Sequence, residues 1–188
     1  MSKNIKIAIS GRSGCGNTTV SKMIADALGL CFINFTFRSL AKERNLELKD
    51  VLTLAAKDDS IDKEVDTRQV QLAMESGGCV LGSRLAIWML KDADLKVYLD
   101  ATPKTRAARI VNREGGSLEE IAVFTADRDR QDHGRYLRIY NIDTDDYSFA
   151  DLIIDTDSIN PQQITEIIIN RAKMIHTEAQ RHGGHGIN

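Results

Sequence analysis

The chain has 188 residues, a length typical of one compact domain, and its hydrophobic content of 42% is high enough to build a core. Two prolines and only 5% aromatic residues argue against a proline-rich linker protein and against a stacking platform for single-stranded nucleic acid. The net charge of -2 argues against bulk attraction to nucleic acid or to a membrane surface, so we expect neither as a partner.

Cysteine usage and hydropathy predict the cellular compartment. The three cysteines, an odd number without CxxC spacing, favour free thiols over a disulfide framework or a zinc site. No apolar run reaches the roughly 18 residues of a membrane span, and the first residues lack the pattern of a signal peptide. These features favour a reducing cytoplasm.

Short apolar, β-branched runs alternate along the chain with stretches of helical periodicity. The runs are bounded by glycine or polar turn residues, which predicts buried strands. Pro103 and Pro161 each stand where the first turn of a helix tolerates proline. The expected strands are 5–9, 31–34, 79–81, 95–99 and 152–154, and the expected helices outside the insertion described next are 18–28, 85–91, 103–114, 118–140 and 161 to about 178.

Residues 36–77 interrupt this alternation, because they carry helical patterns broken near Asn45 and Asp58 and contain no strand signal. Three consecutive helices there indicate an insertion into an α/β order. Five strands separated by helices predict a mostly parallel five-stranded sheet flanked by helices. In that architecture ligands bind beyond the carboxyl ends of the strands.

The segment GRSGCGNTT, residues 11–19, lies between the first expected strand and the first expected helix. It fits the phosphate-binding loop pattern GxxxxGK[ST] at both glycines and at Thr18, and glycines let backbone N–H groups fold around phosphate oxygens. A tight turn without a ligand is the alternative, although three glycines in six residues exceed what a turn needs. The residues expected to bind nucleotide phosphates are Gly11, Arg12, Ser13, Gly14, Cys15, Gly16, Asn17, Thr18 and Thr19.

Asn17 occupies the position of the lysine in this pattern. That lysine normally reaches the β- and γ-phosphates during phosphoryl transfer, whereas an amide donates hydrogen bonds without a positive charge. Arg12 is a candidate for the missing cation, and a solvent-directed side chain is the alternative. Two functions stay open at this point: active phosphoryl transfer, and nucleotide binding with weak or lost catalysis.

Six segments, taken in their order and spacing, resemble the cytidylate kinases, and in particular the short type associated with archaea and some bacteria. The resemblance extends from residue 5 to about residue 169, although most of the segments are weakly specific by themselves. The segments are GRSGCGNTT, FRSLAKERN, SRLAIWM, DADLKVYLD, REGGSLEE and YNIDTDDYSFADLIIDTD. The fold implied is the nucleoside monophosphate kinase version of the P-loop α/β fold.

The resemblance also implies a division of the chain and a reaction. Residues 1–178 would form a single P-loop kinase domain, with an insert at about 36–77 that binds the nucleoside monophosphate and a lid at about 113–135. The glycine-rich composition of the last residues predicts a flexible tail over 179–188. The reaction implied is ATP + CMP ⇌ ADP + CDP with Mg²⁺, with dCMP as a further acceptor and Thr18 as a hydroxyl ligand of the metal. Another small-molecule kinase, of the adenylate or nucleoside type, is the alternative enzyme, and we expect a monomer.

Three arginines are expected to bind the acceptor nucleotide. The resemblance implies this role for Arg84, which directly follows an expected strand, and for Arg38 and Arg68 on the insert. A planar guanidinium suits the task because it binds phosphate oxygens in bidentate fashion. A solvated position is the alternative for Arg38 and Arg68, since surface arginines are common.

Arg128, Asp132 and Arg135 follow one another at i, i+4 and i+7, which places them on one face of an expected helix. Cytidylate kinases carry such a set at the edge of the lid, so the resemblance implies catalytic phosphate binding by the arginines and an orienting or nucleotide-binding role for Asp132. A salt-bridged solvent face is the alternative. Arg113 precedes a Gly-Gly pair that would let a lid close, and it is expected to move toward the donor phosphates.

Gly82 stands where many relatives carry an acidic residue, so this position and Asn17 lack charges of opposite sign. We hypothesise that the two charges were lost together, which would leave the net charge of the site unchanged. The hypothesis requires positions 17 and 82 to lie near each other in the fold.

Charge is distributed unevenly along the chain. Seven of the fourteen arginines lie between residues 106 and 138, a window without lysine, whereas residues 139–188 contain eight acidic and three basic residues. The near-neutral net charge is therefore an average over a locally positive, arginine-rich segment, which suits the binding of mononucleotide phosphates, and an acidic one. The acidic run 143–146 lacks the residue order of a calcium loop and is expected to form a turn before the last strand.

Overall fold

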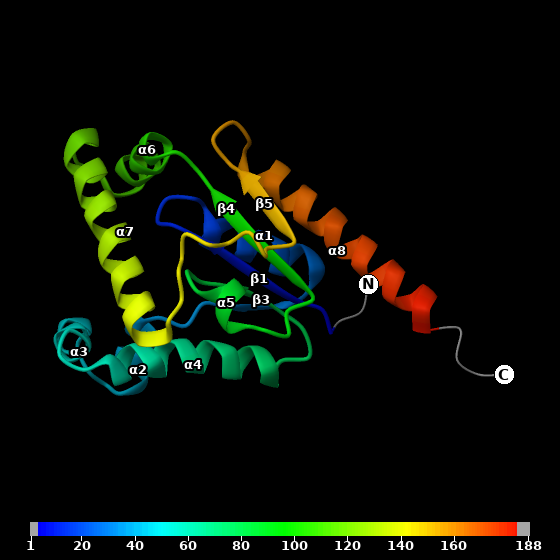
Figure 1. Ribbon diagram of the computed structural model, residues 1–188, viewed down its shortest axis with the longest axis horizontal. Helices are drawn as coiled ribbons and strands as arrows, with labels where there is room; N and C mark the ends of the chain where they lie inside the picture. Colours follow the sequence, from blue (N-terminus) through cyan, green and yellow to red (C-terminus); the bar gives the residue numbers. More distant parts are fainter. Residues whose placement is uncertain (1–3, 184–188) are drawn as a thin grey trace.

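A sheet of five parallel strands forms the centre of the computed structural model, which describes residues 4–183 (Figure 1). The strands are β1 (Lys6–Gly11), β2 (Cys31–Ile33), β3 (Cys79–Gly82), β4 (Leu95–Asp100) and β5 (Leu152–Asp155). Their order across the sheet is β2-β3-β1-β4-β5. This confirms the predicted sheet, and β1 lies in the middle, where Ile9 is in register with Gly82 on one side and Val97 on the other.

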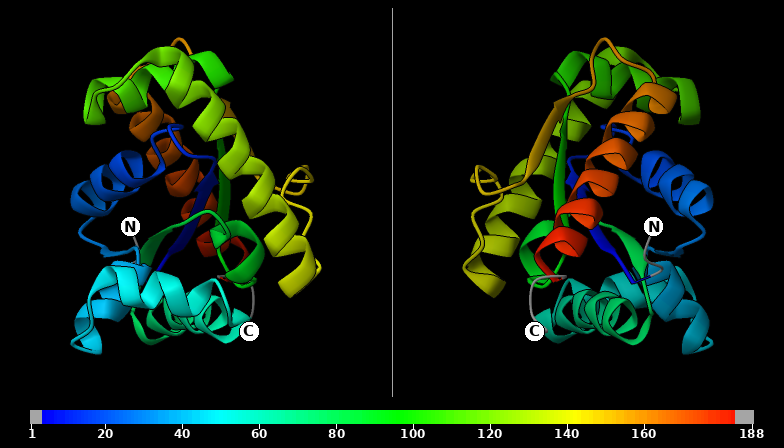
Figure 2. Two further views of the ribbon diagram at one scale, coloured as in Figure 1. Left: turned by 90° about the vertical axis from the view of Figure 1, so that its left-hand side faces the viewer. Right: turned by 90° about the vertical axis from the view of Figure 1, so that its right-hand side faces the viewer.

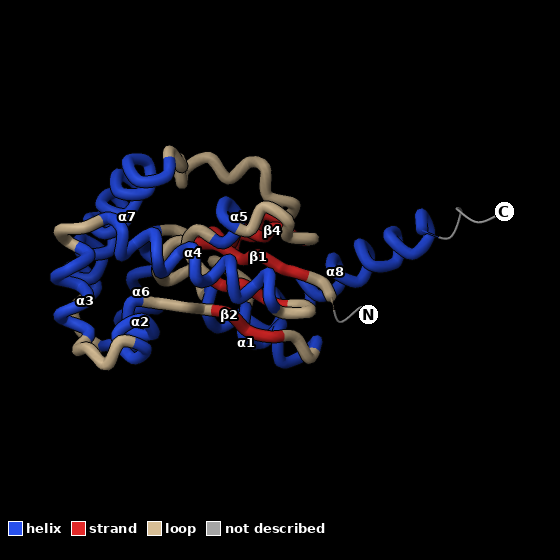
Figure 3. Tube along the Cα trace, turned by 90° about the horizontal axis from the view of Figure 1, so that it is seen from below, coloured by secondary structure: helices blue, strands red, loops and turns tan. Residues whose placement is uncertain are grey.

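Helices cover both faces of the sheet, so the domain has three layers (Figure 3). One face packs against α1 and α8, where Ile24 and Ile168 are completely buried. The other face packs against α4 and α5, where Ala73 and Ile87 are completely buried. The helices are α1 (Asn17–Leu28), α2 (Phe37–Glu43), α3 (Leu48–Ala55), α4 (Asp59–Glu75), α5 (Ala86–Met89), α6 (Pro103–Glu114), α7 (Leu118–Tyr140) and α8 (Pro161–Gly183).

The segment between β2 and β3 consists of α2, α3 and α4, which confirms three consecutive helices in this part of the chain. Asn45, with a φ of 53°, adopts the left-handed conformation that separates α2 from α3. The helices enclose a small core of their own, in which Leu40 and Val51 pack beside Val65. The insert therefore has a core of its own, and α4 also joins it to the sheet, because Ala73 belongs to a sheet cluster and Leu72 packs against both.

Helices α6 and α7 are joined by Gly115 and Gly116, whose φ angles of 82° and 97° favour glycine. Ser117 caps the start of α7 by accepting a hydrogen bond from the backbone N–H of Glu120. From there α7 crosses the molecule toward the inserted helices, as the left panel of Figure 2 shows. A long helix thus spans the distance between α6 and the insert.

Two helix ends differ from the predicted bounds. Helix α5 covers only Ala86–Met89, because Leu90 leaves helical geometry with a ψ of 78°. Helix α8 continues to Gly183, past the predicted end near Glu178, so the first part of the predicted tail is helical and residues 184–188 lie outside the described part of the chain. Within residues 4–183, none of the helices combines the length and apolar character needed to cross a lipid bilayer.

Replacement of Ile168 by alanine tests the packing of α8 on the sheet. Ile168 is completely buried in the cluster that joins α1, α8 and the strands, so we expect Ile168→Ala to lower the free energy of unfolding by about 2–5 kcal/mol. Urea unfolding measures this change. The matched control is Ile167→Ala, because Ile167 is 41% exposed on the same helix and should cost less than about 1 kcal/mol. Equal losses in the two variants would contradict the packing described here.

Candidate active site

A cleft of about 430 Å³ opens beyond the carboxyl ends of β1 and β3 and is bordered by the loop after β1, α4 and α7. Parallel α/β folds bind their ligands at this edge of the sheet. In Figure 1 the blue loop after β1 faces α7, and α4 lies below both. Eight of the nine predicted loop residues line the cleft, and the exception is Cys15.

Cys15 is buried in the core of the sheet instead, with an exposed fraction of 1%. Its backbone N–H donates to the carbonyl of Arg12 at 3.1 Å, which closes the turn of the loop. Burial raises the pKa of the Cys15 thiol to about 11, so the side chain is a protonated packing group.

Two glycines of the loop are required for different physical reasons. Gly14 has a φ of 87°, and a Cβ placed on it would lie 2.7 Å from the carbonyl oxygen of Arg106, so a side chain would force the loop away from α6. Gly16, with a φ of 93°, precedes the first residue of α1 and offers no side-chain cap. The N–H groups at the start of α1 are therefore left to an anion in the cleft.

Two arginines of α6 bind the backbone carbonyls of the loop. Arg106, only 3% exposed, donates to the carbonyl of Ser13 at 3.2 Å and forms an ion pair of 2.7 Å with Asp129 of α7. Arg109 donates to the carbonyl of Gly14 at 3.3 Å. Neither residue belongs to a recognisable motif, and membership in the arginine-rich window is their only signal in the sequence.

The side chain of Asn17 accepts a hydrogen bond from the Ser21 hydroxyl at 3.1 Å. A Cβ placed on Gly82 would lie 3.3 Å from Asn17 Oδ1 and 2.5 Å from Ser21 Oγ. This confirms that positions 17 and 82 are neighbours, while the joint loss of their charges stays a hypothesis. Any side chain at position 82 also requires Ser21 to move.

Asp132 lies at the centre of a group of three arginines that line the cleft. Its carboxylate pairs with Arg84 and Arg135, the latter at 2.7 Å, and lies 3.9 Å from Nε of Arg128. The three side chains of α7 thus share one face, as their spacing predicted, and they meet an arginine from the end of β3. Asp132 itself does not line this cleft, so the carboxylate stands behind the guanidinium groups.

Arg84 connects this network with the loop. It donates to the Ser13 hydroxyl at 2.5 Å while it pairs with Asp132. Burial first, and then the positive charge of Arg128, lower the pKa of Arg84 to about 10. The guanidinium therefore remains charged at neutral pH and stands at the border between the phosphate loop and α7.

The other predicted arginines differ in position. Arg113 lines the cleft but is exposed, and its guanidinium binds Glu114 at 2.6 Å. Arg38 is exposed on α2, and Arg68 donates to Gln71 on its own helix at 3.1 Å; neither lines the cleft. Nucleotide binding by Arg38 and Arg68 stays a prediction.

A polar face of α4 also borders the cleft, and sequence reasoning missed it. Asp62, Asp66 and Gln69 lie at i, i+4 and i+7, a spacing that marks one helix face, and the last two line the cleft. Asp66 accepts hydrogen bonds from the Tyr140 hydroxyl at 2.8 Å and from the Gln69 amide at 3.3 Å. Burial raises the pKa of Asp66 to about 6, against the opposing effect of the hydrogen bond from Tyr140.

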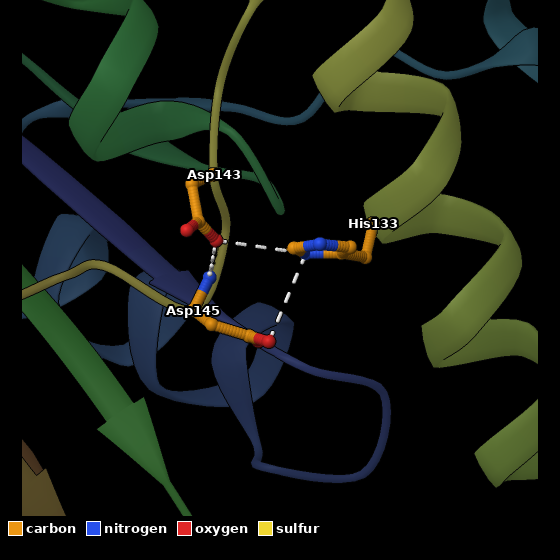
Figure 4. Close-up of side chains that lie close together, drawn as sticks. All are labelled: His133, Asp143 and Asp145. Atoms are coloured by element: carbon orange, nitrogen blue, oxygen red, sulfur yellow. Dashed lines mark hydrogen bonds and ion pairs between the residues drawn. The ribbon is translucent and has the colours of Figure 1, made fainter.

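The acidic turn before β5 meets α7 and the phosphate loop. Figure 4 shows the imidazole of His133 directed toward the carboxylates of Asp143 and Asp145. The distances from Nδ1 are 3.7 Å to Asp143, 3.8 Å to Asp145 and 3.2 Å to the Thr144 hydroxyl. Arg12 of the loop forms an ion pair with Asp145. Arg12 is therefore engaged with a carboxylate, rather than directed freely to solvent, and the turn joins the loop to α7.

Comparisons with known proteins show the family to which the chain belongs. A model described as the cytidylate kinase-like family matches residues 6–158. The chain belongs to this family. Cytidylate kinase 2 of Borreliella afzelii is 49% identical over 168 residues, 87% of this chain and 94% of that protein. The cytidylate kinase of Pyrococcus horikoshii is 43% identical over 164 residues, 86% of this chain and 85% of that protein. The predicted resemblance to cytidylate kinases, archaeal ones included, is confirmed.

Solved structures show the same fold in other kinases. A shikimate kinase from Acinetobacter baumannii in complex with shikimate has a TM-score of 0.64 at 16% identity and covers 92% of this chain and 95% of its own. A deoxyadenosine kinase from M. mycoides with bound dATP has a TM-score of 0.52 at 18% identity, with 90% and 100% covered. At these identities the similarity shows the fold alone, which confirms a P-loop kinase architecture for this member of the cytidylate kinase-like family.

The raised pKa of Asp66 predicts that this carboxylate destabilises the protein at neutral pH. Its folded pKa of about 6 exceeds its unfolded value near 4, so protonation favours folding, and stability falls as the pH rises from about 4 through about 6. Asp66→Asn, which removes the charge, should therefore raise the free energy of unfolding at pH above about 7 by roughly 1–3 kcal/mol and leave it nearly unchanged at pH below about 4. Thermal unfolding across this pH range measures the difference from wild type.

Asp59→Asn is the matched control on the same helix. The hydrogen bond from Arg138 lowers the pKa of the exposed Asp59, so its charge stabilises the folded state above its unfolded pKa. Its replacement should lower stability at neutral pH, with the opposite sign. A loss of stability in Asp66→Asn at neutral pH would contradict the conclusion that the charge on Asp66 destabilises the folded protein.

Proposed function

We propose that this protein is a phosphotransferase that catalyses ATP + CMP ⇌ ADP + CDP and also accepts dCMP. The observation that supports it most directly is one cleft lined by a phosphate-binding loop on one side and by Arg84, Arg128 and Arg135 on the other. A phosphate loop alone fits any nucleotide-binding protein. A second set of phosphate-binding side chains facing it provides for an acceptor that carries a phosphate of its own.

The donor site would be the loop itself. Backbone N–H groups of residues 12–18, together with the start of α1, would bind the β- and γ-phosphates of ATP. Thr18 is exposed in the lining of the cleft, and a hydroxyl that completes a set of waters and phosphate oxygens suits Mg²⁺. When bound there, Mg²⁺ would neutralise charge on the transferred phosphoryl group.

Catalysis would consist of positioning and charge neutralisation, without a covalent intermediate. Asn17 contributes hydrogen bonds but no charge, so the positively charged side chains at the phosphates would be arginines of the cleft lining. Arg84 contacts the loop, while Arg128 and Arg135 approach from α7. Arg113, exposed beside the glycine pair, would move toward the donor phosphates when α7 and the end of α6 close as a lid.

The acceptor would lie between this arginine set and the inserted helices. We assign residues 36–77 as the acceptor-binding insert and about 113–135 as the lid. Arg38 and Arg68 would contribute only after the insert moves toward the cleft, because both lie outside its lining. The described cysteines Cys15, Cys31 and Cys79 are all free thiols, which supports a reducing cytoplasm as the location.

A substrate panel tests the proposed function. We expect a coupled ADP-release assay with ATP to give the highest kcat/KM for CMP, a measurable one for dCMP and lower ones for UMP and AMP. A preference for UMP or AMP would contradict the proposal. The second candidate, a nucleotide-binding protein with weak catalysis, is favoured by the uncharged Asn17. It would be supported if no acceptor gave turnover while ATP still raised the melting temperature.

Arg128 and Arg130 form a matched pair for testing the arginine set. Arg128 lines the cleft, whereas Arg130 lies on the same helix, pairs with Asp127 and is outside that lining. We expect Arg128→Ala to lower kcat/KM for CMP by about 100-fold or more while the melting temperature changes little. Arg130→Ala should stay within about fivefold of wild type. Similar kinetics for the two variants would remove Arg128 from the proposed catalytic set.

A further inference from the structure

The cleft has two parts of different chemistry. The loop after β1, the start of the segment after β3, the end of α6 and the helix α7 contribute its arginines. The insert and the segment leading into it contribute no positive charge; their lining residues include Phe35, Phe37, Val65, Asp66 and Gln69. A mononucleotide is complementary to these two parts, with an anionic phosphate at one end and a flat base with polar edges at the other. The base is therefore expected against α4.

Gln69 has an unsatisfied hydrogen-bond acceptor in this part of the cleft. It is only 4% exposed, and its Oε1 atom has no hydrogen-bond partner among residues 4–183, although its amide nitrogen donates to Asp66. A buried acceptor without a partner costs about 1–3 kcal/mol, so such a group is uncommon unless a ligand completes it. Because Gln69 also lines the cleft, a molecule bound there can supply the missing partner.

Asp66 presents a second acceptor beside it. Tyr140, which lies outside the cleft lining, holds one carboxylate oxygen at 2.8 Å, and Gln69 donates to the other at 3.3 Å. Each carboxylate oxygen has two acceptor sites, so capacity remains for a donor from the cleft side. The Tyr140 hydroxyl thus fixes the direction of a carboxylate whose burial is otherwise unfavourable.

We propose that Asp66 and Gln69 determine specificity for the base of the acceptor nucleotide, with the Asp66 carboxylate accepting a hydrogen bond from the exocyclic amino group of cytosine. This inference rests on the proposed function and names the residues that select its substrate. Cytosine offers an amino donor at C4, whereas uracil offers a carbonyl acceptor at the same position, and carboxylates pair with the former. With uracil bound, two acceptors would face each other in a buried site.

Isosteric replacement of Asp66 tests this role. Asn presents either an acceptor or a donor by rotating its amide, so Asp66→Asn should accept both bases. We expect the ratio of kcat/KM for CMP to kcat/KM for UMP to fall by roughly 100-fold, mainly because turnover of UMP rises while turnover of CMP is kept or only moderately reduced. Asp59→Asn, the same substitution on the exposed face of α4, should keep the wild-type ratio. Equal losses on both substrates, or an unchanged ratio, would overturn the proposal.

The pH dependence of the wild-type enzyme gives a second test that needs no variant. The groups that face Asp66 are Asp62 on its own helix and Arg135, Tyr136 and Tyr140 on α7. With a pKa of about 6, Asp66 becomes a neutral carboxyl in mild acid and can then donate to the carbonyl of uracil. The CMP to UMP ratio should fall roughly tenfold between about pH 7.5 and about pH 5.5, and ionisation of the substrate phosphate cancels in this ratio. A flat ratio would overturn the proposal.

The failures of the two proposals are distinguishable. If wild-type protein turned over no acceptor, or preferred AMP, the proposed function itself would be contradicted. If CMP turnover were normal and the base ratio did not respond to Asp66→Asn or to pH, only the assignment of Asp66 and Gln69 would fail.

Discussion

The carboxylate of Asp132 is the counter-ion on which the arrangement of the cleft depends. It binds Arg84 and Arg135 and lies close to Arg128, so three like charges can stand together beside the phosphate loop before any phosphate arrives. Without that carboxylate the guanidinium groups would repel one another and turn toward solvent. Because Arg84 also donates to Ser13, the same carboxylate couples α7 to the loop. Phosphate oxygens that enter the cleft meet donors that are already oriented.

Parts of this site follow from sequence because their geometry is local. The glycine loop lies within nine residues, and the spacing of Arg128, Asp132 and Arg135 within one helix fixes their common face. The partners that decide their chemistry are distant in the chain: Arg84 meets a loop residue 71 positions away, and Tyr140 meets Asp66 at a separation of 74. No local periodicity encodes such contacts. By sequence alone, Asp66 and Gln69 are indistinguishable from ordinary polar residues of a surface helix, because their role depends on the packing of α7 against α4.

The uncharged residue at position 17 and the arginine-rich window are related, because arginines supply the positive charge that position 17 does not. The loop carries Asn17 at the lysine position of the pattern, yet the cleft is lined by arginines from the loop itself, from the segment after β3, from α6 and from α7. Net charge averages this field away, since acidic residues accumulate after residue 138. At the other part of the cleft, the half-buried carboxylate of Asp66 is also electrostatically unfavourable, as its raised pKa indicates. Natural proteins retain such costs at sites where binding depends on them.

A crystal structure with a bisubstrate analogue, in which cytidine and adenosine are joined through a pentaphosphate, tests the central claim most directly. The expected complex has phosphates bound by the loop of residues 11–19 and by Arg84, Arg128 and Arg135, with the cytosine amino group within hydrogen-bonding distance of Asp66. Phosphates bound away from these arginines, or adenine rather than cytosine against α4, would contradict the proposed arrangement of donor and acceptor.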